Sequence, residues 1–185
     1  MTLPSLRLKA NADRRLRAGH LWVYSNEIDV AVSPLSGFAA GSQAILEAAG
    51  GKPLGIVAMS PQNLICARLL SRDISHVLDK SLLVHRIQVA LSMRERLFDK
   101  PFYRLVFGDS DFLPGLVVDR FGDILVAQLA SATMEQCKND VVAALVQVLK
   151  PSGILLKNDS AARDAEGLER YVTTAHGAVP EWVAL

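Results

Sequence analysis

A long segment without glycine or proline, residues 73–98, divides the sequence into two parts of different pattern. Its apolar residues recur at roughly helical spacing: Ile74, Val77, Leu78, Leu82, Ile87, Leu91 and Leu97. On either side, short apolar runs alternate with turn residues, as in strands. We therefore expect two domains, residues 1–73 and 101–185, joined by a helix within residues 74–100; a length of 185 residues suits this division.

The first part contains several strand-like runs within a short length. These runs cover residues 5–10, 21–28, 42–60 and 64–71. A short helix is expected at 11–19, with Asn11 or Asp13 as its cap and Gly19 at its end. The clearest hairpin lies within residues 42–60, where Gly50-Gly51 can adopt the positive φ of a tight turn. Many short strands in about seventy residues are typical of a small β pseudo-barrel.

The second part mixes strands with a helix. Strands are expected at 102–109, 113–120, 123–131 and 153–159, and a final hairpin from 171–175 and 181–185. Helices are expected at 133–150, with Ser131 or Thr133 as cap, and at 160–169. The predicted fold class is mixed α/β (α+β): a β pseudo-barrel, then a strand-strand-helix-strand-strand domain. Because the chain ends within an apolar run, we expect it to be a piece of a longer protein.

Charge, cysteine content and the length of apolar runs limit the kinds of function that the chain can have. A net charge of +1 means that any binding of nucleic acid must come from a local patch. Cys66 and Cys137 lie far apart, without a CxxC or Cys/His cluster, so no metal site is predicted. The N-terminus lacks the apolar core of a signal peptide, and no apolar run approaches membrane-spanning length. We expect a soluble cytoplasmic protein that does not contact a membrane.

A basic stretch near the N-terminus is the first candidate site. Its members are Arg14, Arg15, Arg17, His20, Trp22 and Tyr24. Arginine pairs with phosphate, and aromatic rings can stack on unpaired bases. On a strand, Trp22 and Tyr24 would share one face. The alternative is a solvated basic helical turn with Trp22 in the core. Lys9 and Arg68 are secondary candidates for the same face.

An acidic stretch, residues 108–123, is the second candidate site. Its charged members are Asp109, Asp111, Asp119, Arg120 and Asp123. Converging carboxylates could perform acid–base chemistry or hold a cation, and the loop could also contact substrate or RNA. The residues favour a third interpretation, in which Pro114-Gly115 forms a type II turn and Gly122 closes a hairpin.

Common catalytic motifs are missing from the sequence. The stretch around Lys52 fails the phosphate-loop pattern because Leu46 and Pro53 stand where glycine and Ser/Thr are needed. No GxGxxG follows a predicted strand, so we expect no cofactor site, including one for S-adenosylmethionine (SAM), in this chain. We assign no catalytic residue.

Three segments resemble one family. "RRLRAGHLWVYSNEI" (14–28) resembles the opening of the PUA domain of SAM-dependent large-subunit rRNA cytosine-C5 methyltransferases. "GDSDFLPGLVVDRFGDILVAQ" (108–128) resembles the signature of their central domain, and "LLKNDSAARDAEGLE" (155–169) resembles a segment further on. Leu21 stands where the family usually has proline, and Lys157-Asn158 where it usually has Glu-Arg.

The resemblance implies a PUA domain and a central domain without the Rossmann-like catalytic domain that follows in the family. That domain carries the SAM site and the nucleophilic cysteine, to which neither Cys66 nor Cys137 corresponds. The implied function is to recognise and position ribosomal RNA for a SAM-dependent methyltransferase. Implied partners are that RNA, the chain's own C-terminal methyltransferase domain and, in a homodimer, a second copy. Asp109, Asp111, Asp119 and Arg120 would contact the substrate or that domain. The alternative is a stand-alone PUA-type RNA-binding or regulatory module without enzymatic activity.

Overall fold

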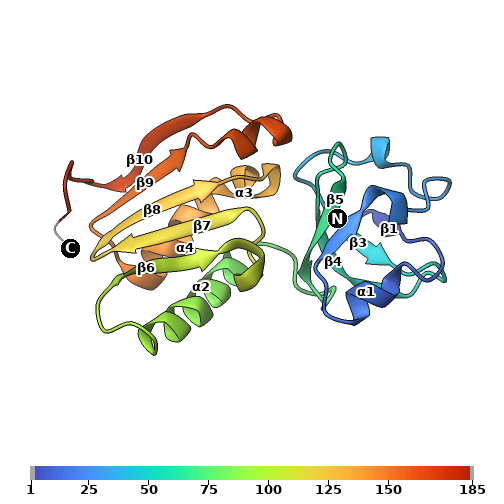
Figure 1. The fold of residues 1–185 in the computed structure, drawn as a ribbon, viewed down its shortest axis with the longest axis horizontal. Coiled ribbons are helices and arrows are strands. Elements are labelled where there is room, and N and C mark those ends of the chain that lie inside the picture. The colour runs from blue at the N-terminus through green and yellow to red at the C-terminus, as the bar shows by residue number, and fades with distance from the viewer. Residues whose placement is uncertain (1–2, 184–185) are drawn as a thin grey trace. The chain divides into compact units, whose positions relative to one another are not determined.

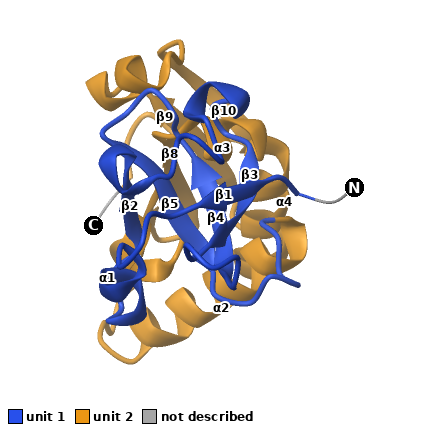
Figure 2. Ribbon diagram, turned by 90° about the vertical axis from the view of Figure 1, so that its right-hand side faces the viewer, with its two compact units in different colours: residues 1–78 blue, residues 79–185 orange. Residues whose placement is uncertain are grey.

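The computed structural model describes residues 3–183 of the chain. Its contacts separate residues 1–78 from residues 79–185, which are called unit 1 and unit 2 and are coloured separately in Figure 2. Both units contain a five-stranded sheet, and the fold is the mixed α/β class that the sequence predicts. Within the described residues, no helix combines the length and apolarity needed to span a membrane.

Unit 1 contains a curled sheet and few helical residues (Figure 1). Its strands are β1 (Ser5–Arg7), β2 (Trp22–Tyr24), β3 (Gln43–Glu47), β4 (Pro53–Met59) and β5 (Ile65–Ser71). Its helical segments are α1 (Asp13–Arg17) and the 3-10 turns η1 (Ser25–Glu27) and η2 (Leu35–Gly37). The strands follow the order β1-β3-β4-β5-β2, with β1 and β3 parallel and the other neighbours antiparallel.

Backbone hydrogen bonds join the two edges of this sheet. Leu8, just after β1, forms an isolated antiparallel bridge with Ile28, just after β2. The Lys9 amide donates to the Glu27 carbonyl at 2.9 Å, and the Asp29 amide donates to the Arg7 carbonyl at 2.9 Å. Both bridge residues are fully buried in the apolar core. Because the two edges pair with each other, few of their backbone N–H and C=O groups stay unpaired, and the sheet closes into the predicted pseudo-barrel.

Local details of unit 1 differ from the sequence expectation. The hairpin of residues 42–60 is present, and Gly51 has a φ of 84°. The short helix begins at Asp13, but its N-cap is Ala12, without a side-chain cap; Asn11 instead adopts a φ of 66°. The expected caps Asn11 and Asp13 are therefore wrong. Gly19, with a φ of 107°, follows the helix as predicted.

Unit 2 combines a sheet with packed helices. Its strands are β6 (Phe102–Phe107), β7 (Leu116–Phe121), β8 (Ile124–Leu129), β9 (Gly153–Asn158) and β10 (Tyr171–Gly177). Its helices are α2 (Lys80–Glu95), α3 (Ala132–Gln136) and α4 (Lys138–Leu149), with 3-10 turns η3 (Gly108–Asp111) and η4 (Ala161–Glu166). The order is β10-β9-β8-β7-β6; only β8 and β9 are parallel, and α3 and α4 connect them. Helices α2 and α4 pack together behind the sheet in Figure 1.

The helix expected over residues 73–98 is shorter in the structure. It begins at Lys80, after Asp79, whose carboxylate accepts from the Leu82 amide at 2.8 Å. Residues 73–78 are not helical, because the Asp73 carboxylate accepts from the Ser75 amide at 2.9 Å and forms a local turn instead. Helix α2 packs against α4 and β6, within unit 2.

Two further expectations about unit 2 need correction. The single helix predicted at 133–150 is divided at Cys137 into α3 and α4, although Ser131 caps it as expected. The final hairpin is wrong for the described part of 181–185, where residues 181–183 form no strand. The Ala178 amide donates to the Ser152 carbonyl at 3.1 Å, so the chain crosses the start of β9 rather than returning along β10.

Candidate RNA interface

Strand β2 directs the two aromatic residues of the basic stretch outward. Val23 is fully buried in the core of unit 1, so its neighbours Trp22 and Tyr24 lie on the opposite face. Trp22 is 41% exposed, which rules out the interpretation that places it in the core. Its direct neighbour across the sheet is Arg68 on β5. The outer face of β2 therefore presents aromatic rings beside a cation.

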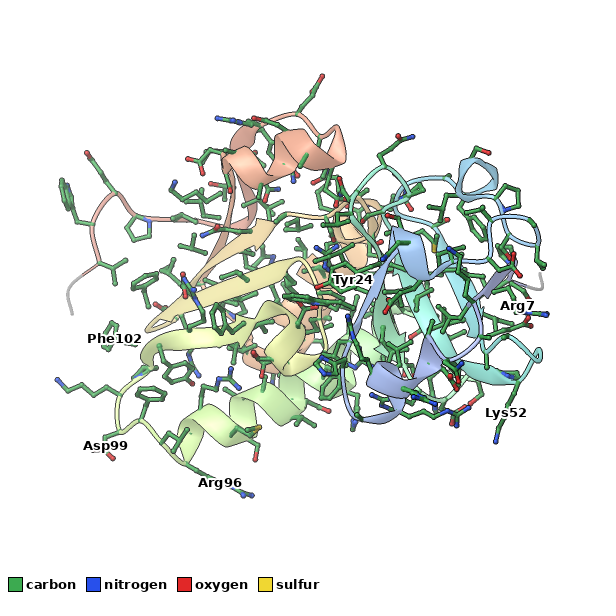
Figure 3. The ribbon with its side chains drawn as sticks, turned by 45° about the vertical axis from the view of Figure 1, so that its right-hand side comes forward. Arg7, Tyr24, Lys52, Arg96, Asp99 and Phe102 are labelled. Carbon is green, nitrogen blue, oxygen red and sulfur yellow. The ribbon has the colours of Figure 1, made fainter. Side chains whose placement is uncertain are left out.

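Arg15 is held against this aromatic face. Its guanidinium lies 4.8 Å from the centre of the Tyr24 ring, and its Nη2 donates to the Trp22 carbonyl at 3.4 Å. Glu27 lies 3.7 Å from the same guanidinium and accepts the Tyr24 amide at 2.8 Å. These contacts hold strand β2, helix α1 and the Glu27 carboxylate in fixed positions relative to one another. Figure 3 labels Tyr24 on β2.

The other basic residues of the stretch are exposed on α1 and on the turn that follows it. Leu16 is buried and anchors the helix, while Arg14, Arg17 and His20 are exposed. Arg17 donates to Asp13 at 2.6 Å, and this hydrogen bond lowers the pKa of Asp13. Lys9 donates to the Asn26 carbonyl at 2.9 Å. The structure thus gathers all six residues of the basic stretch on α1, β2 and the turn between them.

Two cations of unit 1 lie outside this surface. Arg7 is paired with Glu47 through two hydrogen bonds of 2.9 and 2.6 Å, and a Ser5 hydroxyl also donates to that carboxylate, which lowers the pKa of Glu47. Lys52 is exposed on the turn between β3 and β4, and Figure 3 shows both side chains at the outside of the barrel. The Arg7–Glu47 pair joins β1 to β3 and stabilises the barrel away from the basic stretch, whereas Lys52 provides a comparison position for tests of binding.

The acidic stretch does not converge on one point. Asp111 pairs with Arg94 of α2 through two hydrogen bonds of 2.7 Å and also accepts from the Phe107 amide at 2.6 Å. Asp119 pairs with Arg104 on the neighbouring strand at 2.8 and 3.1 Å. Asp109 lies partly buried in η3. Each carboxylate has a separate environment, which matches a role in shaping turns.

The remaining residues of this stretch also form local structure. Arg120 donates to the Gly122 carbonyl at 3.0 Å and to the Tyr103 hydroxyl at 2.8 Å. Gly115 has a φ of 84°, and the Leu116 amide donates to the Leu113 carbonyl at 3.0 Å, as in the predicted type II turn. Among the described residues, no group of three His, Cys, Asp or Glu side chains could hold a metal ion.

A buried polar cluster lies at the carboxyl ends of β8 and β9, and the sequence pattern did not predict it. Arg163 is only 2% exposed and donates to Glu135 at 3.0 Å and to the Glu169 carbonyl at 2.8 Å. The Tyr171 hydroxyl donates to the same Glu135 carboxylate at 2.9 Å. Burial opposes ionisation of Glu135, but the hydrogen bonds from Tyr171 and Arg163 outweigh it and lower its pKa. In the sequence, the one indication of this cluster was Arg163, which lies in the segment 155–169 that resembles the methyltransferase family.

The start of α3 is the position where a parallel sheet would present a helix N-terminus to a nucleotide or cofactor. Here the chain's own groups occupy that terminus. The Ser131 hydroxyl accepts from the Met134 amide at 3.3 Å, and the Glu166 carboxylate accepts from the Ala132 amide at 3.2 Å. A carboxylate and a hydroxyl already accept from these two amides, so this helix terminus does not offer them to a SAM cofactor.

Comparison with known proteins identifies the class of the first domain. Residues 6–72 match the model of the PUA-like domain, so unit 1 contains a domain of that class. Over 95% of its length the chain is 34% identical to ribosomal RNA large subunit methyltransferase I of Aliivibrio fischeri, and over 96% it is 33% identical to that of Vibrio cholerae. The chain is thus homologous to these methyltransferases, and spans 44% of the length of each relative.

Two solved structures share the fold. One is a candidate SAM-dependent methyltransferase from Streptococcus mutans, with a TM-score of 0.76 and 20% identity over 97% of this chain and 45% of the other. The second is SMU.776, a candidate methyltransferase in complex with SAH, with a TM-score of 0.76 and 19% identity over 98% of this chain and 44% of the other. At 20% and 19% identity, these similarities show a shared fold and do not show a shared activity.

Proposed function

We propose that this chain is the RNA-recognition portion of a SAM-dependent rRNA methyltransferase acting on cytosine C5. In this proposal residues 1–73 bind ribosomal RNA through Arg14, Arg15, Arg17, His20, Trp22 and Tyr24. Residues 101–185 form the central domain, and α2, which packs against α4 and β6 of that domain, precedes it. The homology to large-subunit rRNA methyltransferases supports the choice of RNA, because it extends over nearly the whole chain.

One observation carries the proposal: the stacking of Arg15 on Tyr24 at the centre of the basic surface. The guanidinium is oriented by the ring, by the Trp22 carbonyl and by Glu27, so that little side-chain freedom remains to be lost when it binds a phosphate. Exposed arginines on α1 add sequence-independent contacts with the RNA backbone. Aromatic rings on β2 provide stacking contacts for unpaired bases.

The proposal assigns SAM to the remaining part of the longer relatives. SAM would supply the methyl group there, and the residues of this chain would bind and orient the RNA. The occupied N-terminus of α3 supports this assignment, since Glu166 and Ser131 already accept its amides. Asp109, Asp111, Asp119 and Arg120 would shape the loops that face the substrate or the catalytic domain. We further propose a cytoplasmic location, because ribosomal RNA is the substrate.

The test is RNA binding at two salt concentrations. Fluorescently labelled fragments of large-subunit rRNA are titrated with the chain at about 50 and about 200 mM salt. The variant Arg14→Ala/Arg15→Ala/Arg17→Ala is expected to bind weakly and to lose salt dependence by about 0.7–0.9 in slope for each phosphate contact removed. With few phosphate contacts, the wild-type dissociation constant is expected to be about micromolar.

A matched control removes equal charge elsewhere. Lys52, Lys100 and Lys150 are exposed and lie outside the basic surface, so Lys52→Ala/Lys100→Ala/Lys150→Ala changes the net charge by the same amount. Its affinity should remain close to that of the wild type. Equal loss in both variants would mean that overall charge alone attracts the RNA, and that the α1–β2 surface has no special role.

A stand-alone RNA-binding module remains the alternative to a portion of a methyltransferase. Both functions use the same surface of unit 1, so RNA binding does not separate them. The mass of the native protein, measured in cell extract with an antibody against unit 1, separates them directly. A species near the mass of this chain favours the module, and one of about twice that mass favours the methyltransferase, because the relatives are longer by that factor.

A further inference from the structure

Within the described residues, one face of the unit 2 sheet carries no helix. Helices α2 and α4 cover the face that contains the buried residues Val118, Leu125 and Leu156. The register places alternate residues of β6 to β10 on the other face. We call this the open face, and its side chains are those of Phe102, Arg104, Phe107, Val117, Asp119, Phe121, Ile124, Val126, Gln128, Leu155, Lys157, Val172 and Thr174.

Aromatic rings concentrate at the β6–β7 side of the open face. Phe102 and Phe121 are directly opposite each other on the two neighbouring strands. Phe107, at the other end of β6, is 54% exposed and lies opposite Val117. Figure 3 labels Phe102 at the start of its strand. A ring with this exposure offers a flat apolar surface on which another ring can stack.

Charged groups are interleaved with these rings, and the cations are presented to solvent. The Arg104 side chain is 45% exposed, whereas its partner Asp119 is 22% exposed. The Arg104 guanidinium lies 5.2 Å from the centre of the Phe107 ring, so cation and ring form one surface. Lys157, on the same face, is 49% exposed and forms an ion pair of 2.6 Å with Asp159, itself 46% exposed. The hydrogen bond with Asp119 raises the pKa of Arg104.

We propose that the open face is a second RNA-binding surface, which takes unpaired nucleotides. Bases stack on Phe107 and on the Phe102–Phe121 pair, and the Arg104 guanidinium and the Lys157 ammonium pair with phosphates. Gln128 and Thr174 provide hydrogen-bonding groups for base edges and ribose. A sheet with helices on one face and exposed aromatic residues on the other is the arrangement by which RNA-recognition sheets bind single strands.

The composition of the face favours RNA over a protein partner. A protein placed over its β6–β7 side would bury the Arg104–Asp119 ion pair, which costs the hydration of both charges. A nucleotide instead brings a phosphate to the exposed side of Arg104 and leaves Asp119 in place. Charge complementarity of this kind, together with flat rings, suits a single strand. A duplex would hide the base faces from the rings.

This inference stands apart from the proposed role of unit 1, because none of its residues belongs to the basic surface.

The first test compares Phe107→Leu with Phe98→Leu. Phe98 is 48% exposed and follows α2, and its ring stacks on Tyr103, a residue of the covered face, at 5.3 Å. Leucine retains apolar area but removes the flat ring, so it separates stacking from general hydrophobic contact.

Binding is measured by fluorescence anisotropy with a labelled single-stranded RNA of about eight nucleotides and with its duplex. Phe107→Leu is expected to weaken binding of the single strand by about five- to 100-fold, with Phe98→Leu within about twofold of the wild type. Lys157→Gln should weaken it less and reduce the salt dependence. Aromatic NMR resonances of Phe107 should shift when the RNA is added to the wild type.

The outcomes separate the two proposals. The Arg14→Ala/Arg15→Ala/Arg17→Ala background removes the unit 1 surface, so an effect of Phe107→Leu that persists there supports the open face alone. If Phe107→Leu leaves binding unchanged while the triple variant abolishes it, the open face does not bind RNA and unit 1 does. Sedimentation that shows a dimer which Phe107→Leu dissociates, and which RNA does not affect, would make the face a contact between two copies and overturn the inference.

Discussion

Arg94 of α2 and Asp111 of η3 form a two-pronged ion pair in which both nitrogen–oxygen distances are 2.7 Å. Their side chains are only 14% and 6% exposed. Asp111 also accepts the Phe107 amide, so the pair fixes the loop that follows β6 to the helix. A carboxylate with these partners has a structural role, and the loop's conformation depends on it.

Asp111→Asn is expected to destabilise unit 2 by about 2–4 kcal/mol. The amide removes the charge that balances Arg94 and leaves a guanidinium with little solvent contact. Urea unfolding followed by far-UV circular dichroism measures the change. Asp111→Asn/Arg94→Met should lose less than the sum of the single variants, because neither charge is then left alone. A loss below about 0.5 kcal/mol in Asp111→Asn would show that the pair contributes no more than a surface ion pair.

Gly115→Ala tests the turn that joins η3 to β7. Gly115 has a φ of 84°, and a Cβ there would overlap the Ser131 side chain. We expect a loss of about 2–4 kcal/mol in the free energy of unfolding. Gly122→Ala is the control: its φ of 67° is similarly unfavourable for alanine, but a Cβ meets nothing within 4 Å, so about 1 kcal/mol is expected. Equal losses would show that strain in φ alone matters.

Glu135→Gln tests the buried polar cluster through the pH dependence of stability. Burial raises the pKa of Glu135, but the hydrogen bonds from Tyr171 and Arg163 lower it further, so the folded-state pKa is below that of the unfolded chain. The stability from ionised Glu135 is therefore present above the unfolded pKa and is lost as the pH falls through the folded one. Wild type and variant should differ most near neutral pH and converge in acid.

Thermal or urea unfolding from about pH 7 to about pH 3 measures this convergence. Glu47 also has a lowered pKa, but it lies in unit 1 and is intact in both proteins, so it does not affect the difference. A difference that stays constant with pH would mean that the charge of Glu135 contributes nothing to the folded state, and that only its shape is needed.

The two thiols should be poorly reactive in the native chain. Cys66 is fully buried, and burial raises its pKa to about 11. Burial also raises the pKa of Cys137, which is partly buried. Since the thiolate is the nucleophile, iodoacetamide at pH 8 should label Cys66 only as fast as the protein unfolds. Mass spectrometry of peptides from native and urea-unfolded protein compares the rates. Rapid native labelling of Cys66 would contradict its burial.

Several elements were predictable from the sequence because their causes are local. Gly50-Gly51, Pro114-Gly115 and Gly122 mark turns, because the positive φ that such turns need is favourable mainly in glycine. Alternation along β2 puts Trp22 and Tyr24 on one face, and apolar periodicity gives α2 and α4. The resemblance in residues 14–28 and 108–128 also follows from residue identities, and the PUA-like match over residues 6–72 agrees with it.

Contacts between distant segments needed the tertiary structure. The bridge from Leu8 to Ile28, the pair Arg94–Asp111 and the cluster around Glu135 join residues that the sequence separates. The alternation along β2 does not show which of its two faces is buried, because that depends on where the core lies. The sequence therefore left open whether Trp22 is exposed or in the core. Likewise, alternation marks two faces in β6 to β10, but only the packing of α2 and α4 decides which is covered. The sequence determined local backbone geometry; the packing decided which side chains remain exposed.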